Sequence, residues 1–198
     1  MPRPSGRSLP RPASGAFVAI PPLCGVLSGA TAALILAGYS VAAGAAALLG
    51  AALLVIAEVR GGHMVAGMND RRVLRFQFGW RMSSSIFDAS ILAPLAWMER
   101  ITAPRVTVVA LVGLGASYLV AYQLARGQAL GYSGWESVPY RIATAVLLVF
   151  ALLARSLDEA VLEVALWSFA VLAAAGAFTR AWHVKKQDPE TVGAEGPA

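Results

Sequence analysis

Few residues in this chain have side chains that could do chemistry, and most of them fall in one stretch near its middle. The stretch contains two acids, one histidine, one asparagine and three serines. These are Glu58, Asp70, His63, Asn69, Ser83, Ser84 and Ser85. Carboxylates and imidazoles are the groups that bind cations or move protons near neutral pH. No HExxH, Gly-x-Ser-x-Gly, phosphate-binding glycine loop or paired-cysteine pattern accompanies them. The sequence therefore predicts none of the common hydrolase or nucleotide-binding sites.

Arg81 and Asp88 are the ionisable residues for which burial costs most, because both interrupt an apolar run from Phe76 to Met98. A separation of seven residues places them on one face of a helix, two turns apart. Charges inside such runs are usually retained for function or for a partner within the protein. We expect a polar contact between helices at this pair.

A membrane-embedded scaffold must position these residues, because the composition departs far from that of a soluble domain. Of 198 residues, 58% are hydrophobic and 14% are charged, against about 45–50% and 25% in average soluble domains. Basic residues outnumber acidic ones 16 to 11 but fall in gaps between apolar runs, which disfavours nucleic-acid binding. The single cysteine, Cys24, excludes a disulfide framework. We predict an all-α integral membrane protein, a bundle of six transmembrane helices.

The chain divides into three segments at the level of composition. Residues 1–15 are predicted as a disordered basic cytoplasmic tail, 16–182 as the membrane domain and 183–198 as a second disordered cytoplasmic tail. The first two spans lie in an uncharged run with a turn near Gly38 to Ser40, and a polar, basic segment from Arg60 to Arg75 forms the second loop. The later spans are expected from about Ser85 and over Val106–Ala125, Ile142–Ala154 and Ala160–Phe178, with Val138–Arg141 extending the short fifth span.

The charge pattern predicts the orientation of the protein in the membrane, and the small residues predict where helices pack closely. If the N-terminus lies in the cytoplasm, the only basic residues on the outer side of the membrane are Arg100, Arg105 and Arg155. Because basic residues are enriched in cytoplasmic segments, both termini are predicted to be cytoplasmic. The heavy use of alanine, and of arginine over lysine, is typical of GC-rich bacterial genomes, which predicts a multi-pass protein of the inner membrane. Gly25-x3-Gly29 and the cluster of Gly113, Gly115 and Ser117 are expected to let helices approach closely, within the bundle or between protomers.

A motif of two glycines and an arginine after the second span resembles the signature of a known family. The pattern is Gly67-x3-Arg71-x7-Gly79, and it resembles a worn copy of the signature of the CDP-alcohol phosphatidyltransferases. These six-helix membrane enzymes transfer a phosphatidyl group from a CDP-linked lipid to an alcohol and release CMP. Their signature, D-x2-D-G-x2-A-R-x7 or x8-G-x3-D-x3-D, bridges the second and third helices.

A second stretch extends the resemblance over roughly residues 17 to 185. Tyr122-x2-Ala125-Arg126-x-Gln128-x2-Gly131, followed by ESVPYR ending at Arg141, is similar to the part after the family's fourth helix. In some members, arginines around this stretch grip a phosphorylated acceptor, so the resemblance implies that Arg126 and Arg141 bind an anionic lipid head group. It also implies membrane lipids as partners, and a homodimer or a heterodimer with an active relative.

This chain departs from the family pattern at the residues that bind metal in the family. The four metal-binding aspartates of the family correspond here to His63, Ala66, Ser83 and Phe87, a set that cannot replace carboxylates around a hard cation. Asp88 lies one residue past the last place, and one helical step turns a side chain by about 100°, so we expect it to point away from the site. Asp70 replaces the signature alanine. The metal site is expected to be lost, with no cofactor.

Three interpretations remain open. The favoured one is a non-catalytic member of this fold, a pseudoenzyme that binds lipid or serves as an accessory subunit in phospholipid or glycolipid metabolism, because the frame is retained while the chemical positions are lost. The second is an active phosphatidyltransferase with a relocated Mg²⁺ or Mn²⁺ site that uses Asp70, Asp88 and His63. The third is an unrelated six-helix membrane protein.

Overall fold

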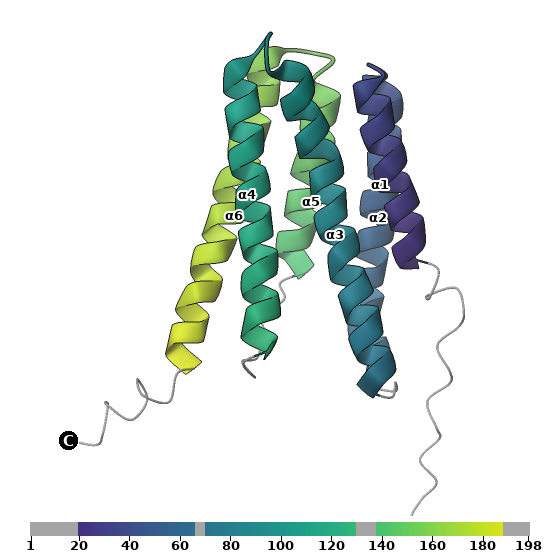
Figure 1. Cartoon of the computed structure of the whole chain (residues 1–198), viewed down its shortest axis with the longest axis vertical. Coiled ribbons are helices and arrows are strands. Elements are labelled where there is room, and N and C mark those ends of the chain that lie inside the picture. Colours follow the sequence, from purple (N-terminus) through teal and green to yellow (C-terminus); the bar gives the residue numbers. More distant parts are fainter. Residues whose placement is uncertain (1–19, 66–69, 130–137, 188–198) are drawn as a thin grey trace, which may run out of the picture.

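A computed structural model describes residues 20–65, 70–129 and 138–187, except the side chains of 60–65, 70–78, 80–81, 128–129, 138, 184 and 186–187. Within these ranges the chain forms six helices, α1 (Ile20–Leu36), α2 (Ser40–Val65), α3 (Asp70–Glu99), α4 (Pro104–Ala129), α5 (Val138–Ala154) and α6 (Glu159–Gln187). Successive helices run in opposite directions (Figure 1). The short α1–α2, α3–α4 and α5–α6 connections lie at one end of the bundle, called here the turn end. The opposite end, where α1 begins and α6 ends, is the tail end.

The six helices close into a ring. Each helix packs against two principal neighbours, in the order α1, α2, α5, α6, α4, α3 and back to α1. Weaker contacts of α3 with α2 and with α5 cross the interior of the ring. Because α3 reaches helices on the far side of the ring, its inward side chains meet residues from distant parts of the sequence.

The first connection matches the predicted turn. Gly38 has a φ of +82°, a left-handed conformation that glycine adopts at little cost. The Tyr39 amide donates to the Leu34 carbonyl at 2.9 Å and the Gly38 amide donates to the Ile35 carbonyl at 3.0 Å. These two bonds satisfy carbonyls that a helix end leaves unpaired, so α1 stops at Leu36 and α2 begins directly afterwards.

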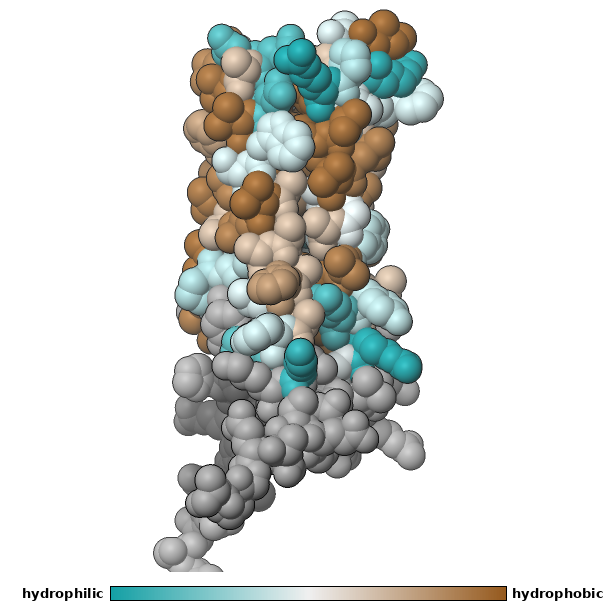
Figure 2. Space-filling view, turned by 90° about the vertical axis from the view of Figure 1, so that its left-hand side faces the viewer, coloured by the Kyte–Doolittle hydropathy of each residue, from teal (hydrophilic) through white to brown (hydrophobic). Residues whose placement is uncertain are grey.

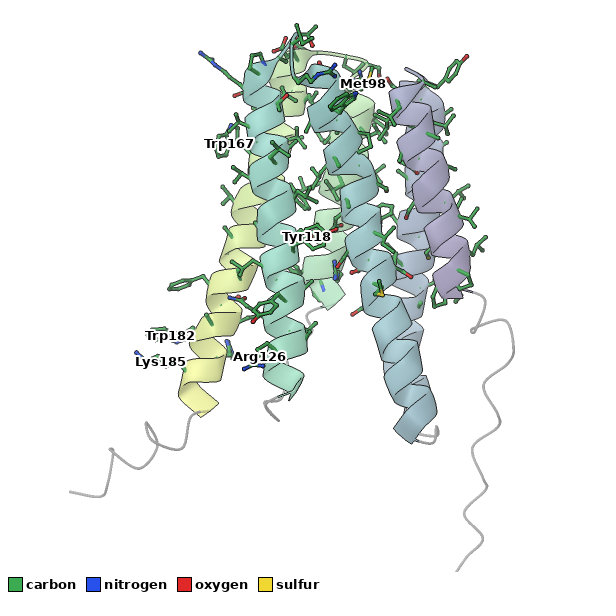
Figure 3. All side chains as sticks on the ribbon, in the orientation of Figure 1. Met98, Tyr118, Arg126, Trp167, Trp182 and Lys185 are labelled. Carbon is green, nitrogen blue, oxygen red and sulfur yellow. The ribbon has the colours of Figure 1, made fainter. Side chains whose placement is uncertain are left out.

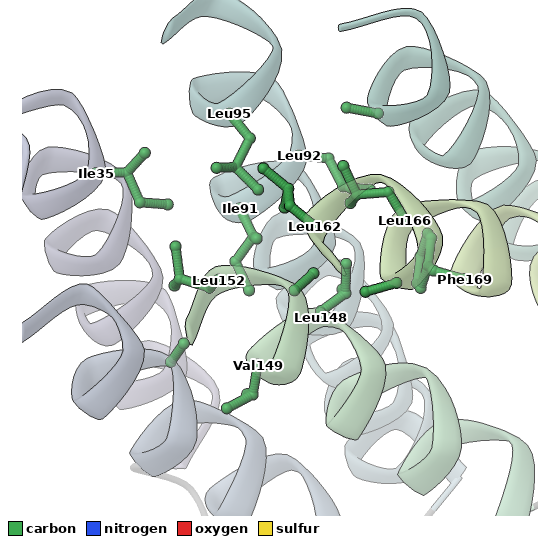
Figure 4. Packing of buried hydrophobic residues seen from close by; sticks show 14 of the residues in the cluster. Ile35, Ile91, Leu92, Leu95, Leu148, Val149, Leu152, Leu162, Leu166 and Phe169 are labelled. Atoms are coloured by element: carbon green, nitrogen blue, oxygen red, sulfur yellow. The ribbon is translucent and has the colours of Figure 1, made fainter. Parts of the chain in front are cut away.

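The core is apolar and continuous along the ring. Figure 4 shows α3, α5 and α6 contributing most of its large side chains, with Ile35 added from α1. The side chains that are fully buried include Ile91, Leu92, Leu95, Leu148, Leu152, Leu162, Leu166 and Phe169. Such packing holds neighbouring helices at fixed distances, and large changes of volume in it destabilise a protein.

Glycines set the closest approaches between helices, though not at all the places the sequence predicts. A Cβ at Gly44 would lie 2.5 Å from Leu153, one at Gly113 would lie 3.0 Å from Phe169, and one at Gly176 would lie 2.6 Å from Tyr140. Gly25 and Gly29, in contrast, have no neighbouring atom within 4 Å of such a Cβ. These two glycines therefore permit no close packing within the bundle, and the alternative, packing between protomers, stays a prediction.

The surface is that of a membrane protein. Among the described residues, three helical stretches are long and apolar enough to cross a bilayer, Ser40–Val59, Pro104–Gly127 and Glu159–His183, and α1 and most of α5 are shorter apolar helices. Large apolar side chains are exposed along them, among them Val108, Leu111 and Val164. Figure 2 shows a hydrophobic band on one face with hydrophilic residues on both sides of it. Membrane insertion is the arrangement that covers such a band.

Charged side chains close the turn end. The Arg155 Nε donates to Glu99 Oε1 at 2.8 Å, which joins the α5–α6 connection to the end of α3. Thr102 donates to the other oxygen of the same carboxylate at 2.9 Å. Arg100 lies over the Trp97 ring, 3.9 Å from its centroid. These contacts connect the α3–α4 and α5–α6 turns.

The helices extend further than the expected spans. The segment from Arg60 to Arg75, expected as a loop, is helical up to Val65 and again from Asp70, and α3 is one helix rather than a span from Ser85. At the other end of the sequence, α6 continues past Phe178 to Gln187. Hydropathy marks the part of a helix that suits lipid, whereas charged residues with good helix propensity continue the same helix beyond it. The extension of α5 to Val138 is confirmed.

The Gly113 contact can be tested by a matched pair of substitutions on α4. Gly113→Leu should lower the free energy of unfolding by about 1–3 kcal/mol, because the new side chain overlaps the buried Phe169 ring. Gly115→Leu, where nothing lies within 4 Å, should change it far less. Reversible unfolding in mixed micelles measures both values, and equal losses would contradict the packing described for Gly113.

Candidate functional site

Two pairs of residues on α3 point to different neighbours. Ser83 and Phe87 lie one turn apart, and so do Ser84 and Asp88, since positions i and i+4 share a helix face. The Ser83 hydroxyl donates to the Gly79 carbonyl at 2.9 Å and lies 3.3 Å from the Pro21 carbonyl of α1. The Phe87 ring lies 3.1 Å from the position that a Cβ on Gly50 would take. The first pair therefore joins α3 to α1 and α2.

The second pair faces the interior of the ring and carries its charge. Asp88 is 5% exposed, and its Oδ2 accepts a hydrogen bond from Ser117 of α4. Arg141 of α5 places Nη1 3.8 Å from the same oxygen, and its Nη2 donates to Ser84. A buried carboxylate needs a counter-charge and donors to remain ionised. Ser117 and Arg141 supply both to Asp88.

A small hollow of about 20 Å³, room for roughly one water molecule, lies beside this ion pair, between α2, α3 and α5. Its polar lining includes Glu58, Ser84, Asp88, Arg141 and Thr144. The apolar part of the lining is made by Leu54, Val55, Phe87, Ile142 and Ala145. The lining is thus divided into a polar side at the ion pair and an apolar side along α2 and α5.

A second polar group lies next to Arg141 and was not predicted from the sequence. Tyr140 contacts α6 where Gly176 leaves room for its ring, and the Arg180 guanidinium lies 5.7 Å from that ring's centroid. Arg180 Nη1 also donates to the Val120 carbonyl of α4 at 3.1 Å. Arg180 comes two residues after the expected last span, Ala160–Phe178, and no motif singles it out. The one sequence signal for a role of Tyr140 was its position directly before Arg141.

The remaining candidates are spread along the tail end. Arg126 is exposed in the last turn of α4, and Figure 3 places it, with Trp182 and Lys185 of α6, towards that end of the bundle. Gly79 lies beside α1, with Pro21 3.8 Å from where its Cβ would be. Ala66 and Gly67, and the side chains of His63, Asp70, Arg71 and Arg81, are outside the described residues. The expected polar contact between helices is found for Asp88, whereas for Arg81 it stays a prediction.

Asp88 and Phe87 point in different directions from α3. The Asp88 side chain is rotated from Phe87 by one helical step, as expected, and the rotation turns it towards the hollow. The reason is the order of helices in the ring, which puts α4 and α5 on the side of α3 that Asp88 faces. Asp88 and Arg141, singled out for separate reasons in the sequence, thus form one site.

The described residues do not fit a diphosphate-binding metal centre. Ser83 is engaged with α1, Phe87 has no ligating atom, and Asp88 is neutralised by Arg141. No group of three or more His, Cys, Asp or Glu side chains that could hold a metal occurs in the described part of the chain. Cation binding by carboxylate oxygens requires charges that are not already compensated. We therefore derive no metal-dependent step from this site.

Comparisons with solved structures identify the architecture. The phosphatidylinositol phosphate synthase of Mycobacterium tuberculosis with CDP-DAG bound matches with a TM-score of 0.62 and 18% identity, over 85% of each chain. The same enzyme in complex with manganese and citrate matches with a TM-score of 0.63 and 18% identity, over 85% of this chain and 81% of that one. The fold is that of a CDP-alcohol phosphatidyltransferase. No protein-family model and no curated protein matches the sequence.

The phosphatidyltransferase fold agrees with the family resemblance in the sequence, and at 18% identity it establishes the arrangement of helices alone. The likeness spans nearly the whole helical region, so the two sites can be compared by position in the bundle. In this chain the interior of α3 presents Ser84 and Asp88 to Arg141. What the site does must be argued from these residues.

The Asp88–Arg141 pair can be tested by a double-mutant cycle. Arg141→Leu should lower the free energy of unfolding by about 3 kcal/mol, because it leaves the buried carboxylate without a counter-charge. Asp88→Leu combined with Arg141→Leu should cost less than the two single changes added together, with a coupling of at least about 1 kcal/mol. The exposed Arg126 serves as the control, and Arg126→Leu should stay within about 0.5 kcal/mol of the parent protein. Additive losses would contradict the pairing.

Proposed function

We propose that this membrane protein uses the phosphatidyltransferase fold to bind an anionic phospholipid without catalysing transfer, as an accessory subunit in phospholipid metabolism. The observation that carries the proposal is the pairing of Asp88 with Arg141 and Ser117 inside the bundle. A carboxylate held in this way is a structural counter-ion. It is poorly suited to share a divalent cation with a diphosphate.

Chemistry on a CDP-linked lipid requires strong stabilisation of phosphate charge. Metal ions provide most of this stabilisation in phosphoryl-transfer sites. Of the four signature places, the two on α3 are occupied by Ser83 and Phe87, whose contacts are with α1 and α2. The interior therefore supports binding of a lipid better than its conversion.

Arg141 is suited to contact the phosphate of such a lipid. Its side chain is 26% exposed, and a guanidinium can donate to Asp88, Ser84 and a further oxygen at once. Arg180 and Arg126 add positive charge at the same end of the bundle. The apolar lining from Leu54, Val55 and Ile142 would accept part of an acyl chain.

One observation favours the second candidate, an active enzyme with a relocated metal site. Glu58 and Asp88 line the same hollow, so two carboxylates are available if Arg141 moves aside. Asp70 and His63 would have to complete the set with Mg²⁺ or Mn²⁺, as the sequence suggests. A homodimer, or a heterodimer with an active relative, stays part of either proposal.

An assay of CMP release separates these candidates. Membranes containing the protein, given CDP-diacylglycerol, Mn²⁺ and a panel of alcohols, should release no more CMP than membranes without it, because Asp88 is already neutralised. Release that depends on Mn²⁺ and disappears in Asp88→Asn, but not in the control Glu163→Gln near the turn end, would establish the active enzyme. Release that persists in Asp88→Asn would equally reject the non-catalytic proposal.

Lipid binding provides the positive test. Native mass spectrometry of the detergent-solubilised full chain should show preferential retention of phosphatidic acid over phosphatidylcholine. Arg141→Gln should weaken the retention about tenfold, since a charge-assisted hydrogen bond to the phosphate is lost. The control Arg100→Gln, at the opposite end of the bundle, should leave it unchanged. Equal retention of both lipids, or equal effects of both substitutions, would contradict the proposed site.

A further inference from the structure

The first turn of α5 is held from one side by a glycine of α6. A Cβ on Gly176 would lie 2.6 Å from Tyr140 Cε2, 2.9 Å from Cζ and 3.1 Å from the hydroxyl oxygen. All three distances are shorter than ordinary carbon contacts, so any larger residue at this position must displace the ring. The ring of Tyr140 can lie against α6 only because position 176 has no side chain.

Arg180 holds the same ring from the next turn of α6. Gly176 and Arg180 are four residues apart and share a face of the helix. The guanidinium lies 5.7 Å from the Tyr140 ring centroid, within the range of cation–π attraction. Its Nη1 donates to the Val120 carbonyl at 3.1 Å, so the contact extends to α4. The ring of α5 is thus held directly by α6, and Arg180 is in turn held by α4.

The residue after Tyr140 is the one that reaches the ion pair. One helical step turns Arg141 by about 100° from Tyr140, which directs Arg141 to α3 while Tyr140 faces α6. The Arg141 guanidinium contacts Ser84 and Asp88. Thr144 strengthens the turn, because its hydroxyl lies 3.1 Å from the Tyr140 carbonyl and 3.0 Å from the Arg141 carbonyl. A rotation of this turn would move Arg141 away from Asp88.

We propose that Tyr140, seated against Gly176 and under Arg180, is a positioning residue that sets the direction of the Arg141 guanidinium towards Asp88 and the hollow. This inference rests on the proposed function only for its effect on lipid binding. The orientation of Arg141 can be measured without any ligand. A misplacement of a binding group by about 1 Å is enough to cost a large factor in a site that depends on geometry.

The orientation is tested by the ¹⁵Nε resonance of Arg141 in the full chain in nanodiscs, assigned by its loss in Arg141→Lys. Tyr140→Ala and Gly176→Ala should each shift this resonance, because the first removes the ring and the second displaces it. Tyr140→Phe, which keeps the ring, should leave the resonance close to that of the parent protein. Gly115→Ala on α4, where no atom lies within 4 Å, is the matched glycine-to-alanine control.

A double variant separates positioning from simple packing. Tyr140→Ala with Gly176→Ala removes the steric overlap, so its thermal midpoint should recover relative to Gly176→Ala alone. The Arg141 resonance should stay shifted, and retention of phosphatidic acid should stay reduced about tenfold. Recovery of the resonance along with the midpoint, or an unshifted resonance in Tyr140→Ala, would overturn the inference. A shifted resonance in a protein whose parent retains no phosphatidic acid would support positioning and reject the proposed function.

Discussion

The Asp88–Arg141 ion pair is the constraint on which the interior of this bundle depends. In a medium of low polarity a carboxylate is tolerated only beside a counter-charge and hydrogen-bond donors. Asp88 receives these from α4 through Ser117 and from α5 through Arg141, and Arg141 also donates to Ser84 of α3. These three consecutive helices must therefore keep their register. The apolar core packs around that requirement.

Close approach between helices makes such contacts possible. A ring of six helices brings α5 near α3 only if neighbouring pairs pack tightly, and glycines at 44, 113 and 176 permit this where α2 meets α5, α4 meets α6 and α5 meets α6. At the turn end, a second ion pair, between Arg155 and Glu99, likewise joins helices through opposite charges. Charge and small residues thus specify the bundle together, while the apolar side chains supply most of its buried surface.

Local patterns in the sequence predicted local structure well and long-range contacts poorly. The turn at Gly38 and the start of α5 at Val138 were both predictable, because glycine geometry and charge snorkelling act over a few residues. The lengths of α2 and α3 were not, since hydropathy does not mark where a helix ends. Arg141 was a candidate through a family resemblance, but its partner Asp88 is 53 residues away, at 88 against 141, and only the order of helices in the ring brings them together.

The two faces of α3 also bear on how motifs on a helix are compared between proteins. Aligning Gly79 with the signature glycine assigns the last two acidic places to Ser83 and Phe87, which face α1 and α2. Phe87 also lines the hollow, but the contacts with Arg141 are made by the residues one step later, Ser84 and Asp88. Among the described side chains of α3, Asp88 is the carboxylate that reaches Arg141. Comparisons of related proteins should therefore match residues that lie on the same face of a helix. A shift of one residue in the spacing of a motif turns its side chains towards a different neighbouring helix.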